Sequence, residues 1–160
     1  MRILLVQSYL GRREKPIYPI GLAILSSVLK DHEVKVIDPN LLPDPANDIA
    51  RTAASFQPEL VGISLRNLDT TQIRDPFVYL PGLEITMRAI KGALPDVPLV
   101  IGGSGFSIYA RELMERYPEI DYGVYLEAES SFPRLLNNLN NPETVPGVFY
   151  RKGGGLNFTG

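Results

Sequence analysis

Gly102, Gly103 and Gly105 lie within four residues of one another, directly after an apolar run at residues 99–101. Glycine tolerates positive φ angles and lets a ligand approach the main chain closely, so this turn could form the floor of a ligand site. If a helix follows, its unpaired N–H groups would favour a phosphate or another polar part of the ligand. A tight strand-to-helix turn would need the same glycines without any ligand. The segment lacks the GxGxxG spacing of a dinucleotide site, and the chain has no GxxxxGK[ST] motif of a P-loop.

Residues 66–82 form a polar stretch that is long for a connection within a compact domain. Several of its side chains could hydrogen-bond a polar ligand: Arg66, Asn67, Asp69, Thr70 and Thr71. Three others could cover that ligand: Phe77, Tyr79 and Leu80. Long loops at a binding edge are often functional, but a surface excursion packed by its own aromatic rings would have the same composition.

Glu127 and Glu129 follow a predicted strand at residues 122–126. They could accept hydrogen bonds from amides or hydroxyls of a ligand, or they could stabilise the N-terminus of the helix that follows. Ser64 ends another predicted strand and could hydrogen-bond a buried ligand, but without a nearby histidine base it is not expected to be a nucleophile. His32 is expected at the opposite end of the sheet, as a solvated residue at a helix end. No catalytic residue and no protein metal ligand are therefore predicted.

The composition excludes several kinds of site. The chain of 160 residues has no cysteine and one histidine, which excludes disulfides, thiolate nucleophiles, cysteine-held clusters and multi-histidine metal sites. With a net charge of -2 and no basic block, neither a nucleic-acid partner nor a membrane partner is expected. No apolar run reaches the roughly 18 residues of a membrane span, and the N-terminus lacks the order of a signal peptide, so we expect a cytoplasmic protein.

Five apolar runs predict strands at residues 3–6, 34–37, 60–65, 99–101 and 122–126. Segments with helical spacing separate them, starting near Pro19 and at residues 49–56, 83–94, about 107–117 and 131–139. Residues 146–160 predict a hairpin around three consecutive glycines. Alternating strands and helices are typical of an α/β domain with a parallel sheet and right-handed crossovers. We therefore expect a Rossmann-like (flavodoxin-like) doubly wound sheet of five parallel strands, in the order 2-1-3-4-5, with a C-terminal hairpin.

The predicted topology brings the candidate residues to one edge of the sheet. In such sheets a ligand binds at the carboxyl ends of the strands, near the reversal of strand order. The loops at that edge are residues 7–19, 66–82, 102–107 and 126–130. The candidates named above, except His32, fall in or beside these loops, so one ligand could contact them together.

Several segments, taken in order, resemble a known family. They read PIYPIGLAILSSVLK at 16–30, VIDPN at 36–40, LVGISL at 60–65, AIKGALPDVPLVIGG at 89–103 and YPEIDYGVYLEAESSFPRLL at 117–136. They are similar to the cobalamin-binding domain at the N-terminus of cobalamin-dependent radical S-adenosylmethionine enzymes. The similarity runs from Met1 to about Tyr150. It implies a domain over residues 1–145 that holds cobalamin, with residues 146–160 as a hairpin or linker toward a catalytic domain.

The resemblance also implies which residues hold the cofactor. Segments after the third and fourth strands would line its nucleotide tail. The PxYP-xGL segment would lie near the corrin, and the acidic turn after the fifth strand would complete the site. The implied cofactor-binding residues are Tyr9, Tyr18, Pro19, Gly21, Ser64, Leu65, Arg66, Asn67, Gly102, Gly103, Ser104, Gly105, Phe106, Glu127 and Glu129.

Departures from the family pattern define the kind of cobalamin protein that is expected. Relatives of the methionine synthase type carry a DxHxxG motif whose histidine binds cobalt, whereas this chain reads QSYLGRR after its first strand. Cobalamin would therefore bind without a protein histidine on the metal. Leu126 and Ala128 replace the glycines of the family's GEGE-like turn, and the segment GGSGF has no histidine after its glycines.

The lack of cysteine bears on the reaction. Radical S-adenosylmethionine chemistry needs a CxxxCxxC motif to hold an iron–sulfur cluster, and the chain has none. We expect a module that is not catalytic alone, an excised or naturally short domain whose S-adenosylmethionine and iron–sulfur cluster belong to a downstream domain. The resemblance implies methyl transfer or related radical chemistry for the full-length protein. Two alternatives stay open: a stand-alone flavodoxin-like or glycosyltransferase-like enzyme that binds FMN or a sugar nucleotide, and an interaction domain.

Overall fold

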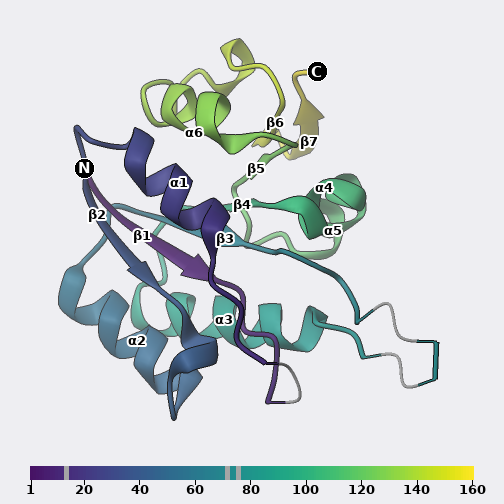
Figure 1. Ribbon diagram of the computed structural model, residues 1–160. Coiled ribbons are helices and arrows are strands. Elements are labelled where there is room, and N and C mark those ends of the chain that lie inside the picture. The colour runs from purple at the N-terminus through teal and green to yellow at the C-terminus, as the bar shows by residue number, and fades with distance from the viewer. Residues whose placement is uncertain (13–14, 71–72, 75–76) are drawn as a thin grey trace.

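The described part of the chain, residues 1–12, 15–70, 73–74 and 77–160, forms one seven-stranded sheet in this computed structural model (Figure 1). Five strands are parallel, and their spatial order is β2-β1-β3-β4-β5. They are β1 (Arg2–Gln7), β2 (Glu33–Ile37), β3 (Leu60–Ser64), β4 (Leu99–Gly102) and β5 (Tyr122–Val124). The antiparallel strands β6 (Val148–Lys152) and β7 (Gly155–Phe158) continue the sheet beyond β5. The predicted α/β fold, parallel order and C-terminal hairpin are confirmed.

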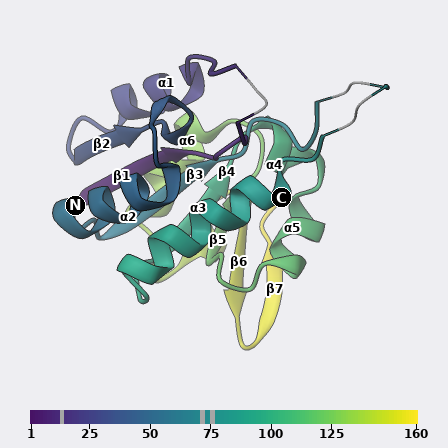
Figure 2. The same cartoon turned by 90° about the horizontal axis from the view of Figure 1, so that it is seen from below.

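Helices cover both faces of the sheet (Figures 1 and 2). One face carries α1 (Ile20–Val28) and α6 (Ala128–Leu136). The other carries α2 (Pro45–Phe56), α3 (Leu80–Ala93) and α5 (Ala110–Arg116). The short α4 (Ser104–Ile108) links β4 to α5, and 3-10 turns occur at Pro39–Leu41 and Pro142–Thr144. None of the described helices has the length and apolar character needed to cross a membrane.

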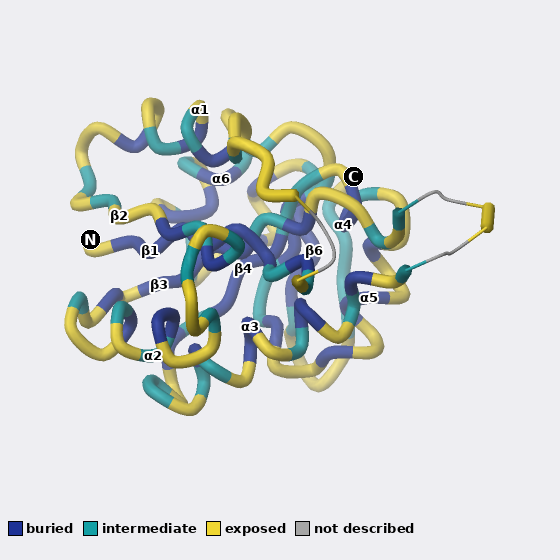
Figure 3. The backbone as a smooth tube through the Cα atoms, turned by 60° about the horizontal axis from the view of Figure 1, so that its bottom comes forward, coloured by how far each residue is buried: buried dark blue, intermediate teal, exposed yellow. Residues whose placement is uncertain are grey.

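β1 is an interior strand of the sheet, because it pairs with β2 on one side and with β3 on the other. Its residues Ile3, Leu4, Leu5 and Val6 are fully buried (Figure 3), because successive side chains point into opposite helical layers. Ile3 and Leu5 join the cluster under α1 and α6, whereas Leu4 and Val6 join the cluster under α2 and α3. A strand covered on both faces requires this continuous apolar run.

Several helices begin earlier than predicted: α3 and α6 each begin three residues before their predicted starts, and two other helices on the α2 side differ more. α2 begins at Pro45 rather than at residue 49, because proline suits the first helical turn and the Asp48 carboxylate accepts a hydrogen bond from the Asp44 N–H group. The helix predicted near residues 107–117 begins at Ser104 and is interrupted at Tyr109. The φ of -132° at Tyr109 is not helical, so two short helices form in place of one.

The long loop after β3 folds back on itself. The Thr70 N–H group donates to the Phe77 carbonyl at 3.0 Å, and the rings of Phe77 and Tyr79 meet edge to face with centroids 5.7 Å apart. Residues 73–74, drawn between two grey traces in Figure 3, project away from the body of the domain. The predicted ligand contact Thr71 lies outside the described residues. The packed ends of this loop support the idea of an excursion held by its own aromatic rings.

A hydrogen-bonded pair joins α3 to the end of α5. The Tyr117 hydroxyl donates to Glu84 Oε1 at 2.9 Å, and Arg116 lies beside both groups. Burial of Tyr117, followed by its hydrogen bond to the Glu84 carboxylate, raises the pKa of the hydroxyl. A tyrosine hydroxyl is protonated at neutral pH in any case, and this shift keeps it a donor to the Glu84 carboxylate, which ties the two helices together.

Candidate functional site

A cavity of about 230 Å³ opens at the carboxyl edge of the sheet, between α1 and α6, which lie side by side on that face (Figure 1). Its deep wall is apolar and comes from the sheet and both helices: Leu5, Leu22, Leu25, Val100, Val124 and Phe132. The strand order reverses between β1 and β3, and both strands contribute to the wall. The cavity therefore lies at the switch point where ligands bind in open α/β sheets.

Glycines make room for this cavity. Gly62 in β3 and Gly102 in β4 both line it. A Cβ atom on Gly62 would lie 2.9 Å from Leu5 Cδ2, so a side chain there would displace the wall. Gly103 has a φ of 100°, and a Cβ atom on it would lie 2.6 Å from the Leu65 carbonyl oxygen, so only glycine allows this turn out of β4. The glycine turn predicted from the sequence thus lies at the cavity, and its contact with a ligand stays a prediction.

Polar side chains gather at the mouth of the cavity. Ser64 ends β3 and is half-buried, whereas Glu127 and Glu129 are exposed at the start of α6. Glu127 occupies the N-cap position of α6 without a capping hydrogen bond from its side chain. Glu129 lies in the first turn, where its charge complements the helix dipole. The carboxylate of Glu127 is therefore available to a ligand, while that of Glu129 also stabilises the helix.

Leu126 stands at the mouth in a conformation that leucine seldom adopts. Its φ of 60° is left-handed, and its side chain is 62% exposed while lining the cavity. The Leu126 N–H group donates to Ser107 Oγ at 2.9 Å, which holds the turn. This turn ends β5 at Val124, two residues before the end of the predicted strand. Backbone strain of this kind is concentrated at ligand sites, which favours a ligand contact for Leu126.

The structure places the predicted cofactor-binding residues in three groups. One group lines the cavity: Gly21, Ser64, Gly102, Gly103, Glu127 and Glu129. A second group lies at the same edge of the sheet outside the cavity, exposed or half-buried: Tyr9, Tyr18, Pro19, Arg66, Asn67 and Ser104. The third group is buried in the fold: Leu65, Gly105 and Phe106. Phe106 packs edge to face with Phe149 in the cluster on the α5 side, so its ring lies across the sheet from the cavity.

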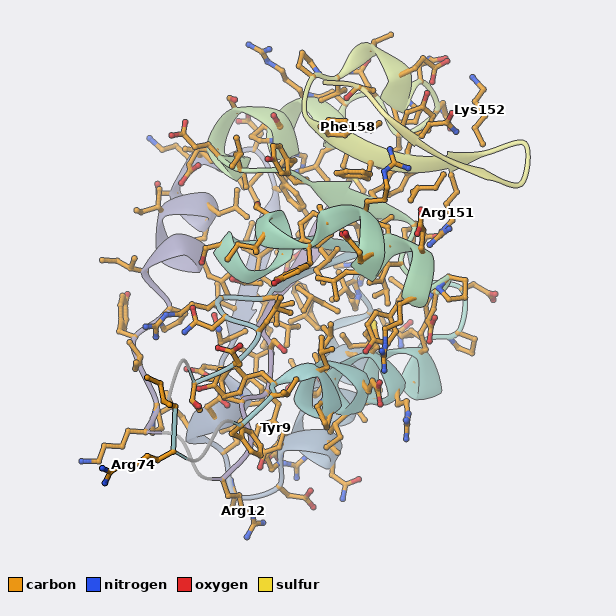
Figure 4. The ribbon with its side chains drawn as sticks, turned by 90° about the vertical axis from the view of Figure 1, so that its right-hand side faces the viewer. Tyr9, Arg12, Arg74, Arg151, Lys152 and Phe158 are labelled. Carbon is orange, nitrogen blue, oxygen red and sulfur yellow. The ribbon has the colours of Figure 1, made fainter. Side chains whose placement is uncertain are left out.

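Two side chains fix the segment that follows β1. Asn40 Oδ1 accepts a hydrogen bond from the Leu10 N–H group at 2.7 Å. Thr86 Oγ1, in α3, accepts one from the Tyr9 N–H group at 3.1 Å. Tyr9 and Arg12, labelled in Figure 4, help to line a second depression of about 480 Å³ beside this segment. The described residues that follow β1 are thus held from both sides, by the 3-10 turn at Pro39–Leu41 and by α3.

His32 lies at the opposite edge of the sheet, directly before β2, as expected from the sequence. Its ring is half-buried rather than solvated, and Nδ1 has no hydrogen-bond partner among the described residues. Within the described ranges, no group of three histidine, aspartate or glutamate side chains is arranged to hold a metal ion. Because His32 lies at the amino edge and the cavity opens at the carboxyl edge, the histidine is remote from any ligand bound in the cavity.

The apolar wall of the cavity was not predicted. Leu5, Leu22 and Phe132 have the spacing and burial of ordinary core residues, so their residue types do not mark them as facing a ligand. One available signal was Gly62, because a glycine inside an apolar strand indicates a close approach by another group.

Comparison with known proteins identifies the family. The profile of the B12 binding domain matches residues 8–136 of the chain. The chain is also 28% identical over 131 residues to the uncharacterised methyltransferase PH0819 of Pyrococcus horikoshii, which covers 81% of this chain and 26% of that protein. The chain thus spans about a quarter of the length of this curated relative.

Two solved structures of the radical S-adenosylmethionine methyltransferase TsrM from Kitasatospora setae share the fold. The structure with tryptophan and the analogue aza-SAM bound has a TM-score of 0.87 and 27% identity, over 99% of this chain and 30% of that one. The structure with cobalamin and a [4Fe-4S] cluster bound has a TM-score of 0.84 and 27% identity, over 97% of this chain and 28% of that one. The resemblance seen in the sequence motifs is confirmed. The chain belongs to the B12-binding domain family, whose cofactor is cobalamin.

Proposed function

We propose that cobalamin binds with its corrin across the carboxyl edge of the sheet and its nucleotide tail in the cavity between α1 and α6. The observation that carries this placement is the cavity itself, which combines an apolar wall, glycines at its floor and a polar mouth at the switch point. The residues fit the group, since a flat aromatic base suits the wall, and a sugar and amide groups suit the mouth.

Each part of the site has a separate role in this proposal. Gly21, Gly102 and Gly103 let the cofactor approach the main chain closely. The Ser64 hydroxyl and the Glu127 carboxylate hydrogen-bond the tail or the corrin amides at the mouth. Bound cobalamin supplies a cobalt centre suited to methyl transfer or related radical chemistry. With His32 at the opposite edge, the chain holds the cofactor by contacts to its periphery and without a histidine on cobalt.

The module is proposed to act within a larger radical S-adenosylmethionine system. Support comes from the similar TsrM enzyme, and from the chain's own lack of the cysteines that an iron–sulfur cluster needs. In this proposal residues 1–145 hold the cofactor, and residues 146–160 lead toward the catalytic domain. S-adenosylmethionine and the cluster belong to that domain. The reaction of the full-length protein is methyl transfer or related radical chemistry, and the proposed location is the cytoplasm.

Reconstitution tests the binding directly. The purified chain, mixed with hydroxocobalamin and separated from free cofactor by gel filtration, is expected to retain about one corrinoid per chain, measured by absorption. Loss of all corrin absorbance from the protein fraction would contradict the proposal. Yellow colour on purification, or stabilisation by a sugar nucleotide in place of cobalamin, would support the FMN or glycosyltransferase alternative.

His32→Ala provides a test of how cobalt is held. Because His32 lies at the amino edge of the sheet, the variant is expected to bind cobalamin with an unchanged absorption spectrum. The measurement is the spectrum of the reconstituted variant beside that of the unmodified chain. A shift of the corrin bands in the variant would show that the histidine reaches the metal and that the placement is wrong.

A further inference from the structure

Cobamides are corrinoids that differ in the base of the nucleotide tail, and cobalamin is the one that carries dimethylbenzimidazole. We propose that the cavity discriminates among them by this base, accepting a benzimidazole and disfavouring a purine. The inference rests on the proposed placement of the nucleotide tail and goes beyond it, because it assigns a chemical preference to the deep wall. Three features of that wall carry it: its size, its apolar side chains and the hydrogen-bonded state of its main chain.

The cavity has the size of a fused pair of aromatic rings. A cavity of about 150 Å³ lined by leucine, isoleucine and phenylalanine is enough for benzene. The volume of about 230 Å³ between α1 and α6 exceeds this by roughly half, as a second fused ring requires. Because adenine and dimethylbenzimidazole both contain two fused rings, size alone does not separate them, and the chemistry of the wall decides.

The deep part of the wall offers no side-chain hydrogen-bonding group. Its side chains are Leu5, Leu22, Leu25, Val100, Val124 and Phe132, and the polar residues that line the cavity lie at its mouth. The main chain of the two strands beneath the wall is also paired: β3 pairs with β1 and β4, and β4 pairs with β3 and β5. In strands with a neighbour on both sides, the N–H and C=O groups hydrogen-bond to the adjacent strands. A polar base edge inserted against the sheet therefore finds no partner in these side chains or in these strands.

The two bases differ at the edge that would enter deepest. Each base is joined to its sugar through the five-membered ring, so the six-membered ring leads into the cavity. In dimethylbenzimidazole this ring carries methyl groups, which suit the apolar side chains. In adenine it carries ring nitrogens and an amino group, which lose their water without replacement. Each buried and unpaired polar group of this kind lowers affinity by about tenfold or more.

Titration of the chain with three corrinoids tests the preference. We expect cobalamin to bind at least about tenfold more tightly than the adenine-bearing cobamide, and more tightly than cobinamide, which has no base. In a free cobamide, adenine binds the cobalt of the same molecule more weakly than dimethylbenzimidazole does, so it is freer to enter the cavity. This difference favours the adenine cobamide, so a preference for cobalamin would arise in spite of it. Equal binding of cobalamin and either other corrinoid would overturn the selectivity while the proposed function stands. Binding of none of the three would overturn the proposed function itself.

A matched pair of variants tests whether the wall is the cause. Val100→Thr adds a hydroxyl to the deep wall with little change of shape, and it should reduce the preference for cobalamin over the adenine cobamide several-fold. Val148→Thr makes the same change in the same buried cluster at a residue that does not line the cavity, and the preference should stay as in the unmodified chain. An unaltered preference in a folded Val100→Thr protein would overturn the assignment to the wall. If that variant does not fold, the titration of the unmodified chain decides.

Discussion

Gly82→Ala is expected to lower the free energy of unfolding by about 2–3 kcal/mol. Gly82 lies in the first turn of α3, and a Cβ atom there would overlap the carbonyl oxygen of Tyr9 in the loop after β1. The loop or the helix must move apart, which strains the hydrogen bond from the Tyr9 N–H group to Thr86 Oγ1. Overpacking and loss of this bond cost about 3–4 kcal/mol together, against a gain of about 1 kcal/mol from the better helix propensity of alanine. Steric overlap therefore outweighs propensity.

The control lies in the same helix. A Cβ atom on Gly92 would meet no described atom within 4 Å, so Gly92→Ala should stabilise the protein by up to about 1 kcal/mol through helix propensity alone. Urea unfolding of both variants and the unmodified chain measures the difference. Similar stabilities for the two alanine variants would mean that α3 and the loop after β1 are not in the close contact described.

Arg151→Met is expected to lower the free energy of unfolding by about 2–3 kcal/mol, because one guanidinium satisfies several main-chain acceptors. Its Nε donates to the Ile120 carbonyl at 3.0 Å, and its Nη2 donates to the carbonyls of Tyr117, at 3.2 Å, and Met114. These carbonyls lie at or beyond the end of α5, where acceptors lack helical partners and a positive charge is favourable. Figure 4 shows Arg151 on the hairpin, beside α5.

Neighbouring variants separate this effect from a loss of charge. Arg151→Lys should recover only part of the stability, because a single ammonium group does not reproduce the planar fork of donors. Lys152→Met removes the next side chain, whose ammonium group pairs with the Glu143 carboxylate at 2.7 Å on the solvent-exposed surface. Because exposed ion pairs contribute little to stability, the midpoint of urea unfolding should hardly change. If Arg151→Met and Lys152→Met had the same midpoint, the link between the hairpin and α5 would be unimportant for stability.

The parallel part of the fold was predictable because its pattern has few solutions. Runs such as LVGISL, separated by segments with helical spacing, fit strands covered on both faces and hardly anything else. The hairpin was expected as a hairpin, but its pairing with β5 depends on contacts far apart in sequence. The rings of Phe106 and Phe149 meet edge to face with centroids 6.2 Å apart, and Arg151 anchors β6 to the end of α5. Local sequence patterns carry no information about such contacts.

The edge at which the cavity opens was predictable from topology, but the direction of each side chain was not. Phe106 illustrates the reason. The Leu65 carbonyl accepts a hydrogen bond from the Gly105 N–H group at 2.9 Å, which starts α4 directly after the glycine turn and turns Phe106 into the core. Gly21 shows the opposite case, since it lines the cavity although the segment around it reads as an ordinary amphipathic helix. Helix starts, which decide such cases by one or two residues, are the least predictable feature of a sequence.

The enclosure of β1 between two strands and two helical layers has a consequence for hydrogen exchange. Amide protons of residues 3–6 become accessible only when the sheet itself separates, so their exchange reports the opening of the whole domain and not a local fluctuation. A ligand that binds only the folded state slows such exchange by the factor 1 + [L]/Kd. The exchange rate of the β1 amide protons therefore measures how much of the protein has bound cofactor, although Leu5 is the only residue of β1 that lines the cavity.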